Sequence, residues 1–188
     1  MELWKPGTLE PLTSSLHAAR SSALDSAFLE EIRTFLESAF DDFSDADWAH
    51  AIGGEHVWIA GPAGLISHAS LVARSLVCDG RPVKTGYVEA VATAAAFRRR
   101  GHGTTVMRRL ADLINEQFEM GALSTGTPAF YQTLGWELWQ GPTLVAGPTE
   151  RIRTPDDDGS IMILRTDRSP RLDLNGAIVC GWRPGDVW

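Results

Sequence analysis

The sequence predicts an α/β (α+β) fold in which a mixed, mostly antiparallel central sheet carries helices on both faces. Three observations support this class. Strand-like segments follow one another through short turns between residues 56 and 93, and amphipathic helical segments lie on either side of this block. A basic loop that contains two glycines then joins the last of these strands to the second helix. Strands joined by short turns pair antiparallel, and helices with one apolar stripe cover a sheet face.

The length of the chain favours one domain. Its 188 residues, 44% of them apolar, are enough for one buried core and too few for two comfortable ones. Residues 1–22 are rich in Pro, Ser and Thr and show weak periodicity, so we expect an irregular N-terminal arm there. Residues 23–188 should then form the single domain.

The first helix is predicted from Leu24 to Phe40. Apolar residues recur there at three- and four-residue spacing, and acidic or basic side chains such as Glu30 and Arg33 occupy the other face. The pattern ends where the acidic run 41–47 begins.

Three consecutive strands are predicted next, over residues 56–60, 65–77 and 83–93. They are rich in β-branched and aliphatic residues, and the turns 61–64 and 79–82 separate them. Such short connections make the three strands antiparallel neighbours.

A second amphipathic helix of about four turns is predicted from the apolar spacing between Val106 and Phe118, with Gly121 as its stop signal. A short strand over 122–125 and a short helix that starts at Thr127-Pro128 should follow. Further strands are expected over 135–139 and 161–164, and another short apolar run begins at Ala177.

Several classes of protein are disfavoured by composition. The formal net charge of −7 argues against a nucleic-acid partner and suits a cationic ligand, although solubility alone would also explain it. Cys78 and Cys180 form no ligand cluster, so we expect no metal. No signal-peptide pattern and no run of ~18 apolar residues is present, so we expect a cytoplasmic protein with no membrane partner.

The most informative segment is Arg98-Arg99-Arg100-Gly101-His102-Gly103-Thr104, between a predicted strand and a predicted helix. Glycines let the backbone approach a pyrophosphate, and the helix N-terminus adds free N–H groups and a favourable dipole. The segment lacks the Gly-Lys-Ser/Thr ending of a P-loop and is not the GxGxxG fingerprint. A basic turn whose glycines serve geometry alone is the other interpretation.

Glu89 is the one carboxylate in an otherwise apolar predicted strand. Because an unpartnered buried carboxylate is costly, this side chain should face a cavity or a cation. It is a candidate general base, and a solvent-facing strand residue is the alternative.

The spacing Arg98-x-x-Gly101-x-Gly103 resembles the acetyl-CoA motif of the GNAT N-acetyltransferase superfamily. From about Asp25 onward the chain is similar to the aminoglycoside 2′-N-acetyltransferases of that superfamily. The similarity is carried by residues 86–92, 121–124, 141–143, 153–159 and 182–188, and by Tyr131 with Gly135-Trp136. The Thr-Pro-Asp-Asp-Asp-Gly stretch and the Gly-Asp-Val-Trp ending are far more specific than the glycine loop.

The resemblance implies a GNAT fold, acetyl-CoA as the cofactor, and two groups of binding residues. Main-chain groups of Ala90, Val91 and Ala92 would bind the pantetheine, and Arg98, Arg99, Arg100, Gly101, His102, Gly103 and Thr104 the pyrophosphate. An ordinary buried strand and a basic turn remain the alternatives. The catalytic residues implied are Glu89 as base, Tyr131 as the acid that protonates the thiolate, and Trp188, whose terminal carboxylate would be placed beside the site.

The acceptor implied by the resemblance is a cationic aminoglycoside, acetylated at its 2′-amine, with antibiotic resistance as the outcome. Its amines would be bound by Asp42, Asp47, Glu89, Ser124, Asp157, Asp186 and Trp188. Kasugamycin is an alternative acceptor, because the loops that shape the pocket match loosely. Another small-molecule amine, a protein N-terminus, and a non-catalytic acyl-CoA-binding module also stay open. Family habit and the seven tryptophans suggest a homodimer.

Overall fold

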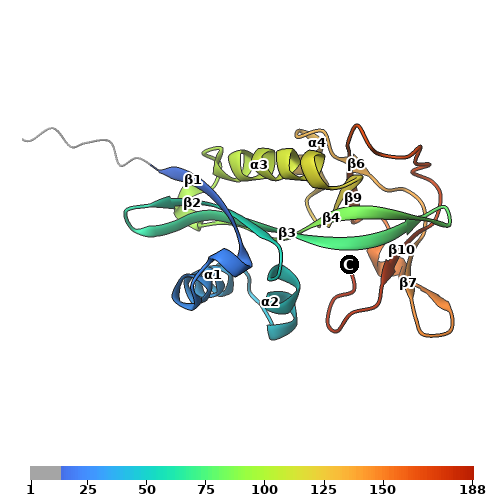
Figure 1. Ribbon diagram of the computed structural model, residues 1–188, viewed down its shortest axis with the longest axis horizontal. Helices are drawn as coiled ribbons and strands as arrows, with labels where there is room; N and C mark the ends of the chain where they lie inside the picture. The colour runs from blue at the N-terminus through green and yellow to red at the C-terminus, as the bar shows by residue number, and fades with distance from the viewer. Residues whose placement is uncertain (1–13) are drawn as a thin grey trace, which may run out of the picture.

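A computed structural model describes residues 14–188 and contains one ten-stranded mixed sheet with helices on both faces (Figure 1). The predicted fold class is confirmed. The strand order is β6-β9-β5-β4-β3-β10-β7-β8, and β2 pairs with β3 and β1 with β2 outside this path. The strands are β1 (Ser15–Arg20), β2 (Glu55–Gly61), β3 (Gly64–Cys78), β4 (Arg81–Thr93), β5 (Met120–Ser124), β6 (Glu137–Leu138), β7 (Thr143–Ala146), β8 (Arg151–Arg153), β9 (Ile161–Arg165) and β10 (Ile178–Gly181).

Helix α3 (His102–Gln117) covers one face of the sheet, and α1 (Ser26–Ala39) and α2 (Asp45–Ala51) lie on the other (Figure 1). Short α4 (Pro128–Gln132) follows β5. The predicted amphipathic faces of α1 and α3 are confirmed, because Ile32 and Leu36 of α1 and Val106 and Leu110 of α3 are fully buried. Among residues 14–188, none of the helices combines the length and apolar character that crossing a membrane requires.

The meander β2-β3-β4 is antiparallel, as predicted from its short turns. It is followed by a parallel pairing of β4 with β5 that lasts only from Thr85 to Tyr87. Beyond Tyr87 the two strands separate, although β4 continues to Thr93. The separation leaves one edge of β4 unpaired and opens a gap in the sheet.

A β-bulge lies in the part of β4 that faces this gap. Ser70 of β3 pairs with Glu89 and His68 with Ala92, so that Ala69 alone lies opposite Ala90 and Val91. Ala90 has a φ of +50°, a left-handed conformation that residues other than glycine seldom adopt. The bulge therefore bends β4 at the positions where the sequence predicted cofactor binding.

The structure corrects four expectations about elements. Residues 15–20 of the expected irregular arm form β1, paired with β2, where His17 stacks on Trp58 at 5.3 Å, while residues 1–13 lie outside the described part. The acidic run contains the start of α2, which begins at a Ser44 capping box. The helix α3 ends at Gln117, and Gly121 lies inside β5, where a Cβ would come within 2.9 Å of Ile114. The strands β7 and β8 were not predicted.

Candidate active site

Two cavities meet at the gap between β4 and β5. One, of about 540 Å³, lies beside α2, the loop 156–160 and the tail 182–188, and we call it the acidic cavity. The other, of about 820 Å³, lies between β4 and the start of α3, and we call it the glycine-loop cavity. Four residues line both cavities: Phe40, Val91, Thr127 and Tyr131. A group bound in one cavity would therefore reach a group bound in the other across these residues.

The glycine-loop cavity has the main-chain geometry of an anion site. Gly101 adopts φ +87° at the N-cap of α3, a conformation that favours glycine. The amide of Thr105 donates the first intrahelical hydrogen bond, to Gly101 at 2.9 Å, so the amides of residues 102–104 have no acceptor within the helix. Free N–H groups at the start of a 16-residue helix suit a phosphate.

The arginines of the glycine loop differ in position. Arg98 and Arg99 line the cavity, with the Arg98 Nε donating to the Thr93 carbonyl at 3.1 Å. The side chain of Arg100 does not line it, and its guanidinium lies over the Phe97 ring at 5.5 Å. Of the predicted cofactor residues, Val91, Ala92, Arg98, Arg99, Gly101, His102, Gly103 and Thr104 line this cavity, and Ala90 lines the acidic one.

These residues fit a coenzyme A thioester. Such a cofactor has a pyrophosphate, for which the amides of 102–104 and the two arginines are suited. It also has an amide-containing pantetheine arm, for which the unpaired edge of β4 offers strand-like main-chain groups. The arm would end at Val91 and Tyr131, where the two cavities join.

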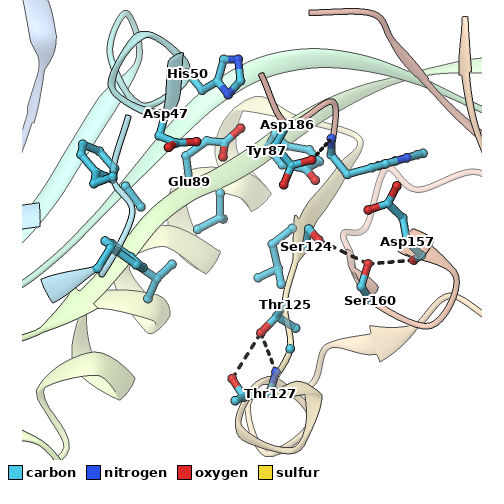
Figure 2. A pocket seen from close by; sticks show the side chains of 18 of the residues that line it. Asp47, His50, Tyr87, Glu89, Ser124, Thr125, Thr127, Asp157, Ser160 and Asp186 are labelled. Carbon is cyan, nitrogen blue, oxygen red and sulfur yellow. Dashed lines mark hydrogen bonds between the residues drawn. The ribbon is translucent and has the colours of Figure 1, made fainter. Parts of the chain in front are cut away.

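The acidic cavity brings together all seven residues predicted to bind the acceptor: Asp42, Asp47, Glu89, Ser124, Asp157, Asp186 and Trp188. Figure 2 shows the side chains of Asp47, Glu89, Asp157 and Asp186 directed into it. Asp156 adds a sixth acidic side chain, and Arg183 is the single arginine in the lining. A cavity with this charge attracts cations and would bind several ammonium groups together.

Asp47 has both a structural contact and a free oxygen. Its Oδ2 caps α2 by accepting from the Ser44 amide at 2.8 Å and the Ser44 hydroxyl at 2.7 Å. Within residues 14–188 its Oδ1 has no hydrogen-bond partner, so this oxygen is available to a ligand. The capping box thus fixes Asp47 on a rigid helix end that faces the cavity.

The run Asp156–Asp158 contains residues with different roles. Asp158 is held by Arg153 at 2.7 Å and by the amide of Thr143 at 2.9 Å, and these hydrogen bonds lower the pKa of its carboxyl. Asp157 instead lines the cavity, where burial raises the pKa of its carboxyl. Asp158 therefore anchors the loop that presents Asp157.

Glu89 lies at the bulge of β4 and is 15% exposed at its side chain. Its Oε1 accepts from the Arg183 Nη1 at 2.6 Å. Burial raises the pKa of the Glu89 carboxyl, and the charge of Arg183 opposes that rise. A carboxyl with a raised pKa is a better proton acceptor from an ammonium group.

Tyr131 reaches the junction of the cavities from the short helix α4. It is 7% exposed, and its ring packs edge-on against Phe130 and Trp136. Burial raises the pKa of its phenol, with a hydrogen bond from Thr125 acting against this rise. The phenol therefore keeps its proton at neutral pH and can donate it.

Trp188 folds back against the site and is 3% exposed. Its indole Nε1 donates to the Thr154 hydroxyl at 2.9 Å, and its amide donates to Asp186 at 3.2 Å. Its main-chain oxygen accepts from Arg183 at 3.0 Å. These contacts hold residues 186–188 along one wall of the acidic cavity.

Sequence reasoning missed several residues that line the acidic cavity: His50, Thr125, Asp156, Ser160 and Arg183. Burial, together with the charge of Arg183, lowers the pKa of the His50 imidazole. The one available signal for Arg183 was its place inside the specific Trp182–Trp188 ending. Within residues 14–188 no cluster of three His, Cys, Asp or Glu side chains is arranged to hold a metal.

The fold and the two joined cavities define a transferase that brings a phosphorylated thioester cofactor to an amine. Residues 20–139 match the family described as acetyltransferase (GNAT) domain. The chain is also 41% identical over 181 residues to the aminoglycoside 2′-N-acetyltransferase of Mycolicibacterium fortuitum, a match that covers 92% of this chain and 93% of that protein. The chain therefore belongs to the GNAT acetyltransferase family, whose members use acetyl-CoA.

Solved structures of low sequence identity share the fold. The GNAT family N-acetyltransferase YhbS from Escherichia coli, in complex with CoA, gives a TM-score of 0.64 at 17% identity and covers 93% of both chains. A GCN5-related N-acetyltransferase from Kribbella flavida gives 0.56 at 18% identity over 69% of this chain. The match covers 34% of the Kribbella flavida protein, about a third of its length.

Proposed function

We propose that this protein transfers the acetyl group of acetyl-CoA to the 2′-amine of an aminoglycoside antibiotic, and that it thereby confers resistance. The observation that carries the proposal is the acidic cavity, whose six carboxylates converge where the glycine-loop cavity ends. The relative from Mycolicibacterium fortuitum, which bears this activity in its name, supports the same acceptor class. We assign the transfer to one domain, which comprises the predicted residues 23–188 together with the strand β1 that pairs with β2.

The residues have complementary roles in the proposed reaction. When bound, acetyl-CoA supplies the acetyl group as a thioester. Glu89 takes a proton from the acceptor ammonium, directly or through water, because only a neutral amine is nucleophilic. The amine nitrogen then bonds to the acetyl carbon as the carbon–sulfur bond breaks, and Tyr131 donates its phenolic proton to the departing sulfur. The nitrogen releases its second proton as the amide forms, and a proton returned through solvent restores the Tyr131 phenol.

Binding of the acceptor is proposed to depend on the other carboxylates. Asp42, Asp47, Asp157, Asp186 and the terminal carboxylate of Trp188 would pair with ammonium groups, and Ser124 would supply a neutral hydrogen-bond partner. The bulge of β4 would direct the amide of Val91 toward the thioester carbonyl and polarise it.

The number of carboxylates favours a polycationic aminoglycoside over kasugamycin, which is smaller and less cationic. Six acidic side chains against one arginine exceed what a weakly cationic acceptor needs. Kasugamycin is therefore the discriminating member of any substrate panel. Turnover of kasugamycin alone would assign the narrow specificity instead.

The test is release of free thiol from acetyl-CoA with a panel of aminoglycosides, kasugamycin, a polyamine and a peptide with a free N-terminus. Release with several aminoglycosides, and a product acetylated at the 2′-nitrogen by NMR, is the expected result. Release with only the peptide or only the polyamine would show that the acceptor is not an aminoglycoside. Bound CoA with no release from any acceptor would favour a non-catalytic acyl-CoA-binding module.

We further propose a homodimer that acts in the cytoplasm, where acetyl-CoA is available. Trp182 is 66% exposed, and association would remove this large apolar side chain from water. Light scattering should give a mass of twice 20.5 kDa. A monomer mass at micromolar concentration would remove this proposal.

A further inference from the structure

One guanidinium in the acidic cavity contacts three separate residues of the site. The Arg183 Nη1 donates to the Glu89 Oε1 at 2.6 Å, its Nε to the Asp186 carbonyl at 2.8 Å, and its Nη2 to the Trp188 main-chain oxygen at 3.0 Å. The Arg183 side chain is 14% exposed, so these contacts are largely shielded from water. Glu89 on β4 and the tail 182–188 are thus joined through a single side chain.

The charge of Arg183 has the wrong sign for binding a cationic acceptor. Every other charged side chain of fixed sign that lines the acidic cavity is a carboxylate, and a guanidinium among them repels an ammonium group. A cation in such a cavity therefore requires a role that offsets this repulsion. The contacts of Arg183 indicate that its role is to orient Glu89 and the tail 182–188.

The ion pair leaves half of the Glu89 carboxylate available. Among residues 14–188, Arg183 is the hydrogen-bond partner of Oε1, and Oε2 has none. A carboxylate held through one oxygen keeps a fixed plane and presents the other oxygen in one direction. The same guanidinium contacts the main chain of Asp186 and Trp188, which line the same cavity.

We propose that Arg183 is a positioning residue for acetyl transfer, because its guanidinium clamps Glu89 and the tail 182–188 so that Glu89 Oε2 is presented to the acceptor amine. The inference rests on the proposed function and assigns no contact of Arg183 with the acceptor. Arg183 therefore has a different role from the carboxylates, which are proposed to bind ammonium groups.

The groups that face Glu89 set the expected pH dependence. They are Arg183 and Asp186 of the tail, Arg74 of β3, Tyr87 of β4, and the side chains of Asp47 and His50 of α2 across the cavity. Burial raises the pKa of Glu89, and Arg183 opposes it more strongly than Arg74 does. Loss of Arg183 should therefore move the acid limb of the kcat/KM profile to higher pH.

The experiment compares Arg183→Met, Arg183→Lys and Arg74→Met with the unmodified protein. The Arg74 Nη2 donates to the main-chain oxygens of Gly181 and Val187, at 3.2 and 2.8 Å, without a hydrogen bond to Glu89. Arg74→Met therefore loosens the tail and removes a weaker charge effect on Glu89, while the Glu89–Arg183 ion pair stays in place. Steady-state kinetics with an aminoglycoside give kcat, both KM values and the pH profile. A carbon-13 NMR titration of the Glu89 carboxyl, assigned with Glu89→Gln, reports on the clamp without any turnover.

For Arg183→Met we expect a fall in kcat of about 10- to 100-fold, the loss typical of a slightly misplaced catalytic group. The KM for acetyl-CoA should stay within about twofold, because Arg183 does not line the glycine-loop cavity. The Glu89 titration should move to higher pH, and less so in Arg74→Met. Arg183→Lys retains the charge and should restore the titration but only part of kcat.

An unchanged Glu89 titration or an unchanged kcat in Arg183→Met would overturn the clamp. If Arg183→Met fails to fold, Arg183→Lys still decides, since full kcat in that variant would also contradict a clamp that needs three separate donors. If the unmodified protein acetylates no acceptor while the Glu89 titration responds to Arg183, the proposed function fails and the clamp is retained. The two failures are therefore distinguishable.

Discussion

The Nδ1 of His68 lies 3.2 Å from the main-chain oxygen of Ala90, the residue in the left-handed conformation at the bulge of β4. The Nε2 of His68 lies 3.0 Å from the Nδ1 of His56, whose Nε2 lies 2.8 Å from the Ser21 hydroxyl. Because the Ala90 carbonyl can only accept, each imidazole must carry its proton on Nδ1. A chain of three side chains thus supports the bulge from inside the sheet.

Replacing His68 with Leu should destabilise the protein by about 2–4 kcal/mol, because it leaves the Ala90 carbonyl and the His56 N–H buried without partners. The KM for acetyl-CoA should rise as the bulge relaxes. Urea unfolding and steady-state kinetics measure the two effects. Ser21→Ala removes the outer end of the chain and is the control, with a loss of about 1 kcal/mol and an unchanged KM. Equal effects in both variants would contradict this assignment.

Acid should destabilise the protein through His56 and His68. Burial lowers the pKa of His56 to about 4 and that of His68 to about 3, from 6.5 in the unfolded chain. The contribution of the neutral imidazoles to stability is fully present above pH 6.5 and is lost as the pH falls toward the folded values. Each histidine should lower the free energy of unfolding by about 1.4 kcal/mol per pH unit between pH 6 and 4.

Urea unfolding at several pH values measures this slope. In His68→Gln, where one of the two imidazoles is gone, the slope should fall by about half. A free energy of unfolding that is independent of pH between 6.5 and 4.5 would show that the histidines are already accessible to protons in the folded state.

The elements that carry local patterns were predictable from the sequence, and those that depend on tertiary contacts were not. The apolar spacing of α1 and α3 and the short turns around β3 predicted these elements close to their observed ends. The strand β1 was missed because its residues are exposed and its order comes from pairing with β2. Gly121 resembled a helix stop, yet it is a glycine because Ile114 and Trp136 leave no room for a side chain.

The same distinction applies to the candidate site. The residues expected to bind an acceptor line one cavity, and the resemblance that named them, rather than their spacing, made that expectation possible. The ion pair of Glu89 with Arg183 joins residues 94 positions apart and has no local signature. Likewise His56 and His68 were not singled out, since the bulge that they support exists only once β3 and β4 have paired.

Replacing Glu89 with Gln should lower kcat by about 10²- to 10⁴-fold, because the amide cannot take a proton from the acceptor. Binding of CoA, measured by calorimetry, should be unchanged, since Glu89 lies outside the glycine-loop cavity. Wild-type kcat in this variant would exclude Glu89 as the base. The activity of Glu89→Gln should also lose the acid limb of its pH profile.

Replacing Tyr131 with Phe should lower kcat by about 10²-fold or more, because no phenolic proton is available to the departing thiolate. Because burial raises the pKa of Tyr131 above its usual 10, the unmodified protein should stay active through pH 9. The edge-on packing against Phe130 and Trp136 is retained by Phe, so Tm should change little. If activity falls between pH 8 and 9 in both the unmodified protein and Tyr131→Phe, the group whose ionisation causes the fall is not Tyr131.

Replacing Gly101 with Ala should weaken acetyl-CoA binding by about tenfold, because a left-handed φ costs a residue with a Cβ about 1–2 kcal/mol and the loop relaxes to avoid it. Gly101 has φ +87° and no atom within 4 Å of an added Cβ, so backbone conformation is the whole effect. Gly80 is the matched control, with φ +80° and equally open surroundings in the turn before β4. Both variants should lose similar stability in urea, and only Gly101→Ala should raise the KM for acetyl-CoA. A raised KM in both would mean that general destabilisation, rather than the orientation of the amides of residues 102–104, governs cofactor binding.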